Sequence, residues 1–311
     1  MKQRLRSAAR AATTLLSLGA AMCVSAPAYA VILSLGEGIG NANLSVVTAT
    51  RHVGALNGAS GTHIGNGWIL TANHIGPGDI TLDGTAYHFL PGSDLRLETS
   101  PGVYADLLMF RVYPAPELPS IPIRTEPPTI GDPVLMVGNG RDRGAAITFD
   151  PYGPDIDPPA QNGWDWAPTK SVRWGLNTVE YINALPILGT TVFMTDFDEV
   201  DPILYESQAA NGDSGGGVFT YDPLKSVELA GIIISVSLEF GQDPTSTIFT
   251  NETIIASLDV YADQIEQNII NAPEPAGGLV MGLGALALMA RVRLGNSCSR
   301  RCLPRLMTGH H

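Results

Sequence analysis

Short apolar runs, separated by glycine, proline, asparagine and aspartate, dominate the chain between residues 31 and 250. Runs of this length between turn-forming residues are typical of β-strands, and many of them in succession indicate an all-β sandwich or barrel. Examples of the predicted strands are Leu44–Thr48, Gly67–Thr71, Leu107–Val112, Val134–Val137, Val172–Trp174, Val192–Met194, Gly217–Thr220 and Leu229–Ser235.

Two further segments have different patterns. Thr253–Ile270 has the three- and four-residue apolar spacing of an amphipathic helix, and Asn251 is expected to cap it. Asp150–Pro168 is rich in proline, aspartate and tryptophan, and we expect a long surface loop there. The acidic side chains of this loop, and those between residues 196 and 201, lack the spacing of an EF-hand, so we expect them to be solvated without a bound metal.

The first 30 residues have three parts: a basic start, an apolar run over residues 11–24, and Ala28-Tyr29-Ala30. This order is typical of a secretory signal peptide with a small-residue cleavage site. The alternative is a membrane anchor, which the short apolar run disfavours. The mature chain is therefore predicted to begin at Val31.

A second tripartite pattern lies at the C-terminus, within residues 271–311. Pro273-Glu274-Pro275 precedes an apolar run over residues 276–290, and Arg291 and Arg293 follow it. The pattern resembles the bacterial PEP-CTERM sorting signal. That resemblance implies a transient inner-membrane contact through 276–290 and removal of the tail by an exosortase-type enzyme. It also implies a final location at the cell surface or outside a Gram-negative-type bacterium. A simple C-terminal anchor is the alternative.

Charge and cysteine content narrow the possible functions. The chain has 18 Lys and Arg against 30 Asp and Glu, but half of the bases lie in the two ends, so residues 31–290 carry a formal charge of −21. A body this acidic repels phosphate backbones, which excludes a nucleic-acid-binding role. All three cysteines lie in the predicted signal peptide and tail, so the body has no disulfide and no thiolate metal site.

Three stretches carry residue types that suit acyl transfer: Gly67 to His74, Ala105 to Val112, and Asn211 to Gly217. A serine hydroxyl becomes a nucleophile when an imidazole takes its proton, and a carboxylate on the other ring nitrogen fixes the imidazole tautomer. Glycines beside the serine let backbone N–H groups turn toward a developing oxyanion.

These stretches resemble the trypsin/chymotrypsin family of serine peptidases, whose marks T-A-x-H, D-[IL]-[AL]-L and G-D-S-G-G occur in this order. Here they are Thr71-Ala72-Asn73-His74, Asp106-Leu107-Leu108-Met109 and Gly212-Asp213-Ser214-Gly215-Gly216. The resemblance implies an all-β fold of two six-stranded antiparallel barrels with a C-terminal helix. The first barrel (31–125) would carry the histidine and aspartate, and the second (126–270) the serine and the helix. No cofactor is implied.

The resemblance also assigns roles. Ser214 would be the nucleophile, His74 the general base and acid, and Asp106 the orienting carboxylate, with the N–H groups of Gly212 and Ser214 as the oxyanion hole. The substrate pocket would comprise Gln208 at its base, Ser237 and Thr247 on its walls, and Ser235, which would also support the aspartate. Because no acid lies at the base, we expect a preference for small or medium uncharged side chains.

Two other hydrolase types fit less well. Gly212-x-Ser214-x-Gly216 also satisfies the nucleophile elbow of α/β-hydrolases, but that fold places its histidine after the serine. The histidines after Ser214 are His310 and His311, beyond the sorting segment. A zinc hydrolase would need a motif such as H-E-x-x-H, which the sequence lacks.

Asp213 raises a separate question, because a buried carboxylate needs a partner. In the digestive branch of the family a new N-terminal amine pairs with this aspartate, but no Ile-Val-Gly-Gly sequence precedes His74. Asp213 therefore pairs either with an internal donor or with the amine of Val31 after signal removal.

The sequence thus predicts an exported serine endopeptidase that works through an acyl-enzyme. Its partners would be a peptide or protein substrate, signal peptidase and an exosortase-type sorting enzyme. The alternatives are a catalytically weak surface-displayed binding module on the same fold, and a structural component of an exosortase-dependent matrix.

Overall fold

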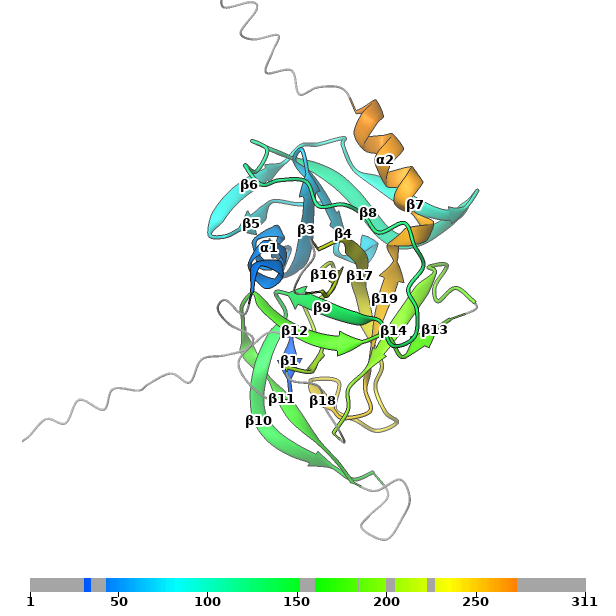
Figure 1. The fold of residues 1–311 in the computed structure, drawn as a ribbon. Coiled ribbons are helices and arrows are strands. Elements are labelled where there is room, and N and C mark those ends of the chain that lie inside the picture. The colour runs from blue at the N-terminus through cyan, green and yellow to red at the C-terminus, as the bar shows by residue number, and fades with distance from the viewer. Residues whose placement is uncertain are drawn as a thin grey trace, which may run out of the picture.

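A computed structural model of the chain describes residues 31–34, 43–151, 160–183, 185–199, 205–222 and 227–272. Within them the chain forms two antiparallel β units, the first drawn in blue and cyan and the second in green and yellow (Figure 1). The predicted signal peptide and the Pro-Glu-Pro tail lie outside the described residues. Among the helices in the described part of the chain, none is long and apolar enough to cross a membrane.

The first unit is a closed barrel. Its strands run in the order β4-β3-β2-β5-β6-β8, and pairing of β8 with β4 closes the ring of six. Strand β7 pairs with β8 on the side away from β4. The strands are β2 (Val53–Leu56), β3 (Ala59–Gly65), β4 (Trp68–Thr71), β5 (Ile80–Leu82), β6 (Thr85–Phe89), β7 (Leu95–Ser100) and β8 (Val103–Tyr113).

Two tight hairpins fix the register of this barrel. Asn57 and Gly58 join β2 to β3 with φ of 49° and 76°, and Asp83 and Gly84 join β5 to β6 with φ of 46° and 76°. Positive φ at both central residues is the type I′ pattern, whose twist matches that of the flanking strands. The sequences Asn-Gly and Asp-Gly are the ones that tolerate this backbone.

The second unit is a curled sheet that stays open. Its strand order is β12-β9-β16-β17-β19-β14-β13. The strands are β9 (Pro133–Gly138), β12 (Arg173–Thr178), β13 (Tyr181–Ile182), β14 (Val192–Asp196), β16 (Gly217–Thr220), β17 (Leu229–Val236) and β19 (Glu252–Ser257). Strand β12 is at one end of this sheet, and its Asn177 side chain donates to the carbonyls of Asp196 in β14 (2.7 Å) and Ser207 (2.8 Å). This side chain connects the two end regions of the sheet where backbone hydrogen bonds would be needed to close a barrel.

Two small sheets flank the second unit. One comprises β10 (Arg141–Phe149), β11 (Gln161–Lys170) and β18 (Ser246–Ile248), and the other β1 (Ile32–Leu33) and β15 (Ser207–Gln208). The predicted loop Asp150–Pro168 is therefore wrong from residue 161 onward. The tryptophans of β11 explain the difference: Trp164 packs edge-on against Phe249, and the Trp166 indole donates to Thr247 Oγ1 at 2.7 Å.

The segment predicted as the strand Leu44–Thr48 is instead helix α1 (Leu44–His52). Asn43 overrides the β-branched residues that follow it, because its side chain accepts a hydrogen bond from Val46 N at 3.1 Å and caps the helix. The Asn43 amide also donates to Tyr221 Oη at 3.0 Å, which ties the helix start to the second unit.

The predicted helix Thr253–Ile270 begins late. Its first residues form β19, which lies between β14 and β17 and pairs with both; a short 3-10 turn η2 (Leu258–Val260) follows, and then helix α2 (Ala262–Asn271). Asn251 does not cap this helix; its side-chain oxygen accepts from Ile248 N at 3.0 Å. Helix α2 lies along the first unit (Figure 1), where Gln264 Oε1 accepts from Glu98 N at 2.9 Å.

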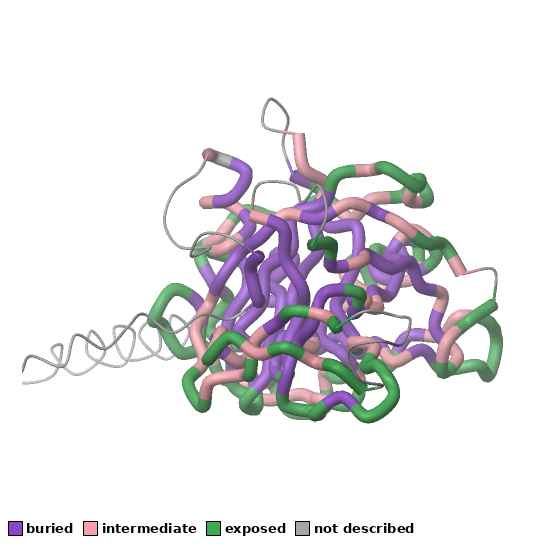
Figure 2. The backbone as a smooth tube through the Cα atoms, turned by 90° about the horizontal axis from the view of Figure 1, so that it is seen from below, coloured by how far each residue is buried: buried purple, intermediate pink, exposed green. Residues whose placement is uncertain are grey.

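The apolar side chains of both units are buried in the middle of the molecule, and the exposed residues gather on the turns (Figure 2). The largest apolar cluster draws residues from both units and from both helices, including Val46, Trp68, Phe219, Tyr261 and Ile265. The predicted fold class is confirmed: the protein is all-β, with a closed six-stranded barrel, a curled half-barrel and a C-terminal helix.

Candidate active site

His74 lies in the 3-10 turn η1 (Asn73–Ile75), directly after β4. Its ring Nδ1 lies 2.8 Å from Asp106 Oδ2, and its backbone N–H donates to Asp106 Oδ1 at 3.0 Å. Both oxygens of one carboxylate therefore hold this residue, one through the ring and one through the main chain.

Asp106 is brought to this position by strand pairing. It belongs to β8, and β8 pairs with β4 in a register that sets Leu108 opposite Thr71. The backbone N–H of Asp106 donates to Thr190 Oγ1 at 2.8 Å, so a side chain of the second unit fixes the aspartate in turn. Sequence reasoning missed Thr190, because a Thr-Thr pair after a glycine has no distinctive pattern.

The contact between His74 and Asp106 shifts the pKa of both groups. The hydrogen bond to Asp106 raises the pKa of His74 above its ordinary value, against the opposing effect of burial. Burial raises the pKa of Asp106, but the hydrogen bond and the charge of His74 outweigh it and the net pKa is lowered. With Nδ1–H donated to the carboxylate, the neutral imidazole keeps Nε2 as a proton acceptor.

Ser214 lies in a tight turn between β15 and β16. Gly212 and Gly215 have φ of 99° and 88°, values that favour glycine, and Gly216 N donates to Asp213 O at 2.8 Å. A Cβ on Gly215 would overlap the Ser60 carbonyl oxygen, so this glycine is also required by space.

The serine turn is hydrogen-bonded to the strands that lead to His74. Ser60 N in β3 donates to Ser214 O at 3.0 Å, and Thr62 Oγ1 donates to Gly215 O at 3.0 Å. Thr71, the last residue of β4, donates its hydroxyl to the Ser60 carbonyl at 2.8 Å. The serine turn is therefore hydrogen-bonded to β3, and β3 pairs with β4, the strand that leads to the histidine turn.

The peptides on either side of Gly212 are held by hydrogen bonds. The Asn211 carbonyl accepts from Arg141 N at 2.8 Å, so the N–H of Gly212, across the same trans peptide, points the opposite way. The Ser60 hydroxyl donates to the Gly212 carbonyl at 2.8 Å and fixes the next peptide. No residue in the described part of the chain accepts from Gly212 N–H or Ser214 N–H.

Asp213 is fully buried and bound by backbone donors. Its Oδ1 accepts from Gly140 N at 2.7 Å, its Oδ2 accepts from Ala210 N at 2.8 Å, and the backbone N–H of Val31 also donates to it. Burial raises the pKa of Asp213 to about 7 in spite of these donors. A carboxylate with this pKa is only partly ionised at neutral pH.

Val31 reaches Asp213 because the segment after it is anchored. Ile32 and Leu33 form β1, which pairs with Gln208 and Ser207 of β15, and residues 31–33 are at most 1% exposed. Both alternatives from the sequence are thus represented: Asp213 has internal donors, and the residue predicted to start the mature chain lies against it.

The predicted pocket residues Gln208 and Ser237 converge on neighbouring positions of β19. Gln208 Oε1 accepts from Thr253 Oγ1 at 2.9 Å, and Ser237 Oγ accepts from Glu252 N at 2.7 Å. Gln208 is fully buried, and its side-chain Nε2 has no hydrogen-bond partner among the residues that the structure describes.

The other two predicted pocket residues have different surroundings. Thr247 is buried in β18, where its hydroxyl accepts from the Trp166 indole. Ser235 is exposed at the end of β17, and its hydroxyl donates to the Val236 carbonyl at 3.4 Å rather than to Asp106.

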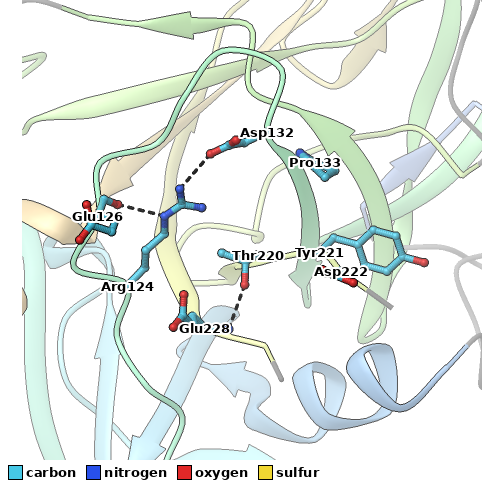
Figure 3. Close-up of a pocket in the computed structure, with 8 residues that line it drawn as sticks. All are labelled: Arg124, Glu126, Asp132, Pro133, Thr220, Tyr221, Asp222 and Glu228. Atoms are coloured by element: carbon cyan, nitrogen blue, oxygen red, sulfur yellow. Dashed lines mark hydrogen bonds and ion pairs between the residues drawn. The ribbon is translucent and has the colours of Figure 1, made fainter. Parts of the chain in front are cut away.

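A separate pocket of about 690 Å³ lies where the linker between the units meets β9 and β16 (Figure 3). Arg124 points across it and donates to Asp132 Oδ2 at 2.9 Å. Its lining residues are Arg124, Glu126, Asp132, Pro133, Thr220, Tyr221, Asp222 and Glu228. No residue of the predicted active site is among them.

Several solved structures are similar to this chain. Two mutants of human heparin binding protein are 12% and 14% identical to it, with TM-scores of 0.49 and 0.48; each comparison covers 72% of this chain and 93% or 94% of the other. Mouse neuropsin, a serine protease, is 12% identical, with a TM-score of 0.47, over 71% of this chain and 96% of its own. No protein-family model and no curated protein matches the sequence.

Proposed function

We propose that the protein is a serine endopeptidase that hydrolyses peptide bonds through an acyl-enzyme. The observation that carries this proposal is the bidentate contact of Asp106 with His74, which follows β4. The glycine-rich serine turn supports it, because that turn is hydrogen-bonded to β3, the strand that pairs with β4. A neutral imidazole with its Nδ1–H on a carboxylate has the protonation state that a general base requires.

The catalytic steps follow from this arrangement. Nε2 of His74 takes the proton of the Ser214 hydroxyl as its oxygen attacks the substrate carbonyl. The N–H groups of Gly212 and Ser214 stabilise the oxyanion, and His74 then gives its proton to the leaving amine as the C–N bond breaks. Water, activated by the same imidazole, hydrolyses the ester and restores Ser214.

We assign the base of the acyl-side pocket to Gln208 and its walls to Ser237 and Thr247, with Ser235 at the substrate backbone. The buried amide at this base carries no charge, which supports a preference for small or medium uncharged side chains. A cleavage profile on a mixed peptide library measures this preference.

We further propose that the protein is exported, with residues 1–30 removed by signal peptidase and residues 271–311 serving as the sorting tail. The sequence patterns at both ends support this part of the proposal. N-terminal sequencing and intact mass of the protein from its native host test it.

Labelling with a fluorophosphonate probe tests the catalytic proposal, because this reagent reacts with an activated serine. Purified protein should be labelled once; S214A should abolish labelling and H74A should slow it strongly. S100A, which changes an exposed serine of β7, is the matched control and should react like the unchanged protein. Folded protein that is not labelled would contradict the proposal and favour a binding module.

A further inference from the structure

Two basic residues lie beside the serine turn of a strongly acidic protein. Arg141 begins β10 and Lys170 ends β11, and the two are register partners in this hairpin. No carboxylate among the described residues forms an ion pair with either one. The charge of the buried Asp213 acts on Lys170 without forming an ion pair with it. In a body with a formal charge of −21, two adjacent cations at this place still need an explanation.

Both residues contact the backbone that forms the proposed oxyanion hole. Arg141 N donates to the carbonyl of Asn211 at 2.8 Å. Lys170 Nζ lies 2.7 Å from the position that a Cβ on Gly212 would occupy, and it donates to the Gly58 carbonyl. The ammonium therefore lies directly beside Gly212, between the serine turn and the β2–β3 hairpin.

The serine turn has two different flanks, and Lys170 lies on one of them. On one flank is β17, where Gly215 N donates to Ile233 O at 2.8 Å and Ile233 N to Gly216 O at 2.9 Å. On the other flank is the β2–β3 hairpin, with Gly58. The serine turn therefore contacts both β17, which carries the proposed pocket residue Ser235, and the hairpin whose Gly58 accepts from the ammonium.

The Lys170 flank is also the side of His74. Asn57, next to Gly58, donates its amide to the carbonyls of Ile75 (3.2 Å) and Pro77 (3.1 Å) in the loop after the histidine. Because His74 must hand its proton to the leaving amine, the leaving part of the substrate passes over this flank. Lys170 is thus placed to meet residues that follow the cleaved bond.

The ammonium has capacity for a ligand. The Gly58 carbonyl uses one of its three donors, which leaves two for an incoming group. Burial and the neighbouring Arg141 both lower the pKa of Lys170, so an added carboxylate would relieve an unfavourable environment. Arg141 uses Nη1 on the Pro168 carbonyl at 2.7 Å, and the rest of its guanidinium adds to the positive field.

We propose that Lys170, supported by Arg141, forms a subsite for a carboxylate on the leaving side of the substrate, so that the enzyme prefers Asp or Glu just after the cleaved bond. The inference rests on the proposed peptidase function and specifies its substrate class. The carboxylate can be a side chain or the C-terminus of a short substrate, since both present the same chemistry to an ammonium.

Matched peptides test this subsite. Each pair is identical except for Asp or Asn at the first or second position after the cleaved bond, and all carry a C-terminal amide. A third set carries Asn with a free C-terminal carboxylate two residues after the bond, which separates the two sources of charge. We expect kcat/KM roughly fivefold higher for Asp than for Asn, with the ratio falling as salt is added.

Variants assign the effect. K170M and K170Q should both bring the Asp/Asn ratio close to one, and R141M should lower it partly. K170Q keeps a donor for the Gly58 carbonyl, and its urea-unfolding midpoint shows whether the fold is intact. R51M, which removes an equal charge on α1, should leave the ratio unchanged.

The outcomes are distinct. A ratio near one in the unchanged protein, or a ratio that survives both Lys170 variants, overturns the subsite while leaving the peptidase standing. Absence of both peptide cleavage and fluorophosphonate labelling overturns the proposed function, and the subsite with it.

Discussion

At the scale of single residues, histidines in this protein have opposite surroundings. His74 is half-exposed and bound to a carboxylate, which raises its pKa. His52 and His63 are buried and stacked with ring centroids 5.3 Å apart, and burial lowers the pKa of both, to about 4 for His63. His52 Nδ1 donates to the His63 carbonyl at 2.8 Å, which fixes the tautomer of His52. The surroundings of His74 suit proton transfer, whereas burial keeps His52 and His63 neutral.

The pH dependence of activity follows from His74. Because the general base must be neutral and Asp106 raises its pKa, kcat/KM should rise with pH through a midpoint above 6.5. D106N should lower kcat/KM by roughly 10³-fold or more, because the amide no longer selects the correct tautomer. A pH profile on one peptide measures both effects, and a midpoint at or below 6.5 would contradict the assigned role.

The pH dependence of stability follows from His63. Its folded pKa of about 4 lies below its unfolded value of 6.5, so the unfolded chain binds the proton more readily and stability falls as pH drops from 6.5 toward 4. The loss amounts to roughly 3 kcal/mol. H63L should flatten this part of the curve, measured by urea unfolding between pH 7 and pH 4.5. The control H88L changes an exposed histidine, and an equal flattening in H88L would refute the explanation.

At the scale of secondary structure, seven of the eight strands named from the sequence form, and the pattern failed where local and distant contacts compete. The prediction of β16 (Gly217–Thr220) was correct, because a short apolar run such as Val218-Phe219 between turn-forming residues favours a strand over other structures. The run after Asn43 reads equally as strand or helix, and the cap on Val46 decided it. Residues 253–257 fit a helical period, yet pairing with two strands at once outweighs that period. Such pairing partners are not visible in a single sequence.

Removal of the α1 cap should destabilise the protein without affecting its chemistry. N43A loses the hydrogen bond from Val46 and the contact with Tyr221, at a cost of about 1 to 2 kcal/mol. N43S restores the cap but not the contact, and Y221F removes the contact alone. Urea unfolding should rank N43A as the least stable of the three variants. Equal stability of N43A and N43S would show that the cap contributes nothing.

At the scale of the whole molecule, the site is assembled from segments that the sequence motifs identify and from others that they do not. The order of histidine, aspartate and serine motifs predicted which side chains to examine, because acyl transfer restricts the residue types. Thr190, Ser60 and Lys170 hold or flank the same site, but their roles come from contacts between the two units. These contacts join residues far apart in the chain, and no local pattern encodes them.

The state of the N-terminus should control the whole site. An ammonium on Val31 would give Asp213 an opposite charge in place of a neutral amide, so the carboxylate would ionise and hold the serine turn. Protein beginning at Val31 should react with a fluorophosphonate roughly tenfold faster than the uncleaved chain. A protein carrying one extra alanine before Val31 is the matched control and should be slow. Equal rates for both would show that the internal donors to Asp213 suffice.

The burial of residues 31–33 also bears on how long the protein survives among other hydrolases. An aminopeptidase binds a free, extended N-terminus. A chain beginning at Val31 would have this end paired with β15 and buried, so the enzyme could not bind it. Trimming from Val31 would require residues 31–33 to detach from β15 first, so an intact Val31 would report that a molecule had stayed folded.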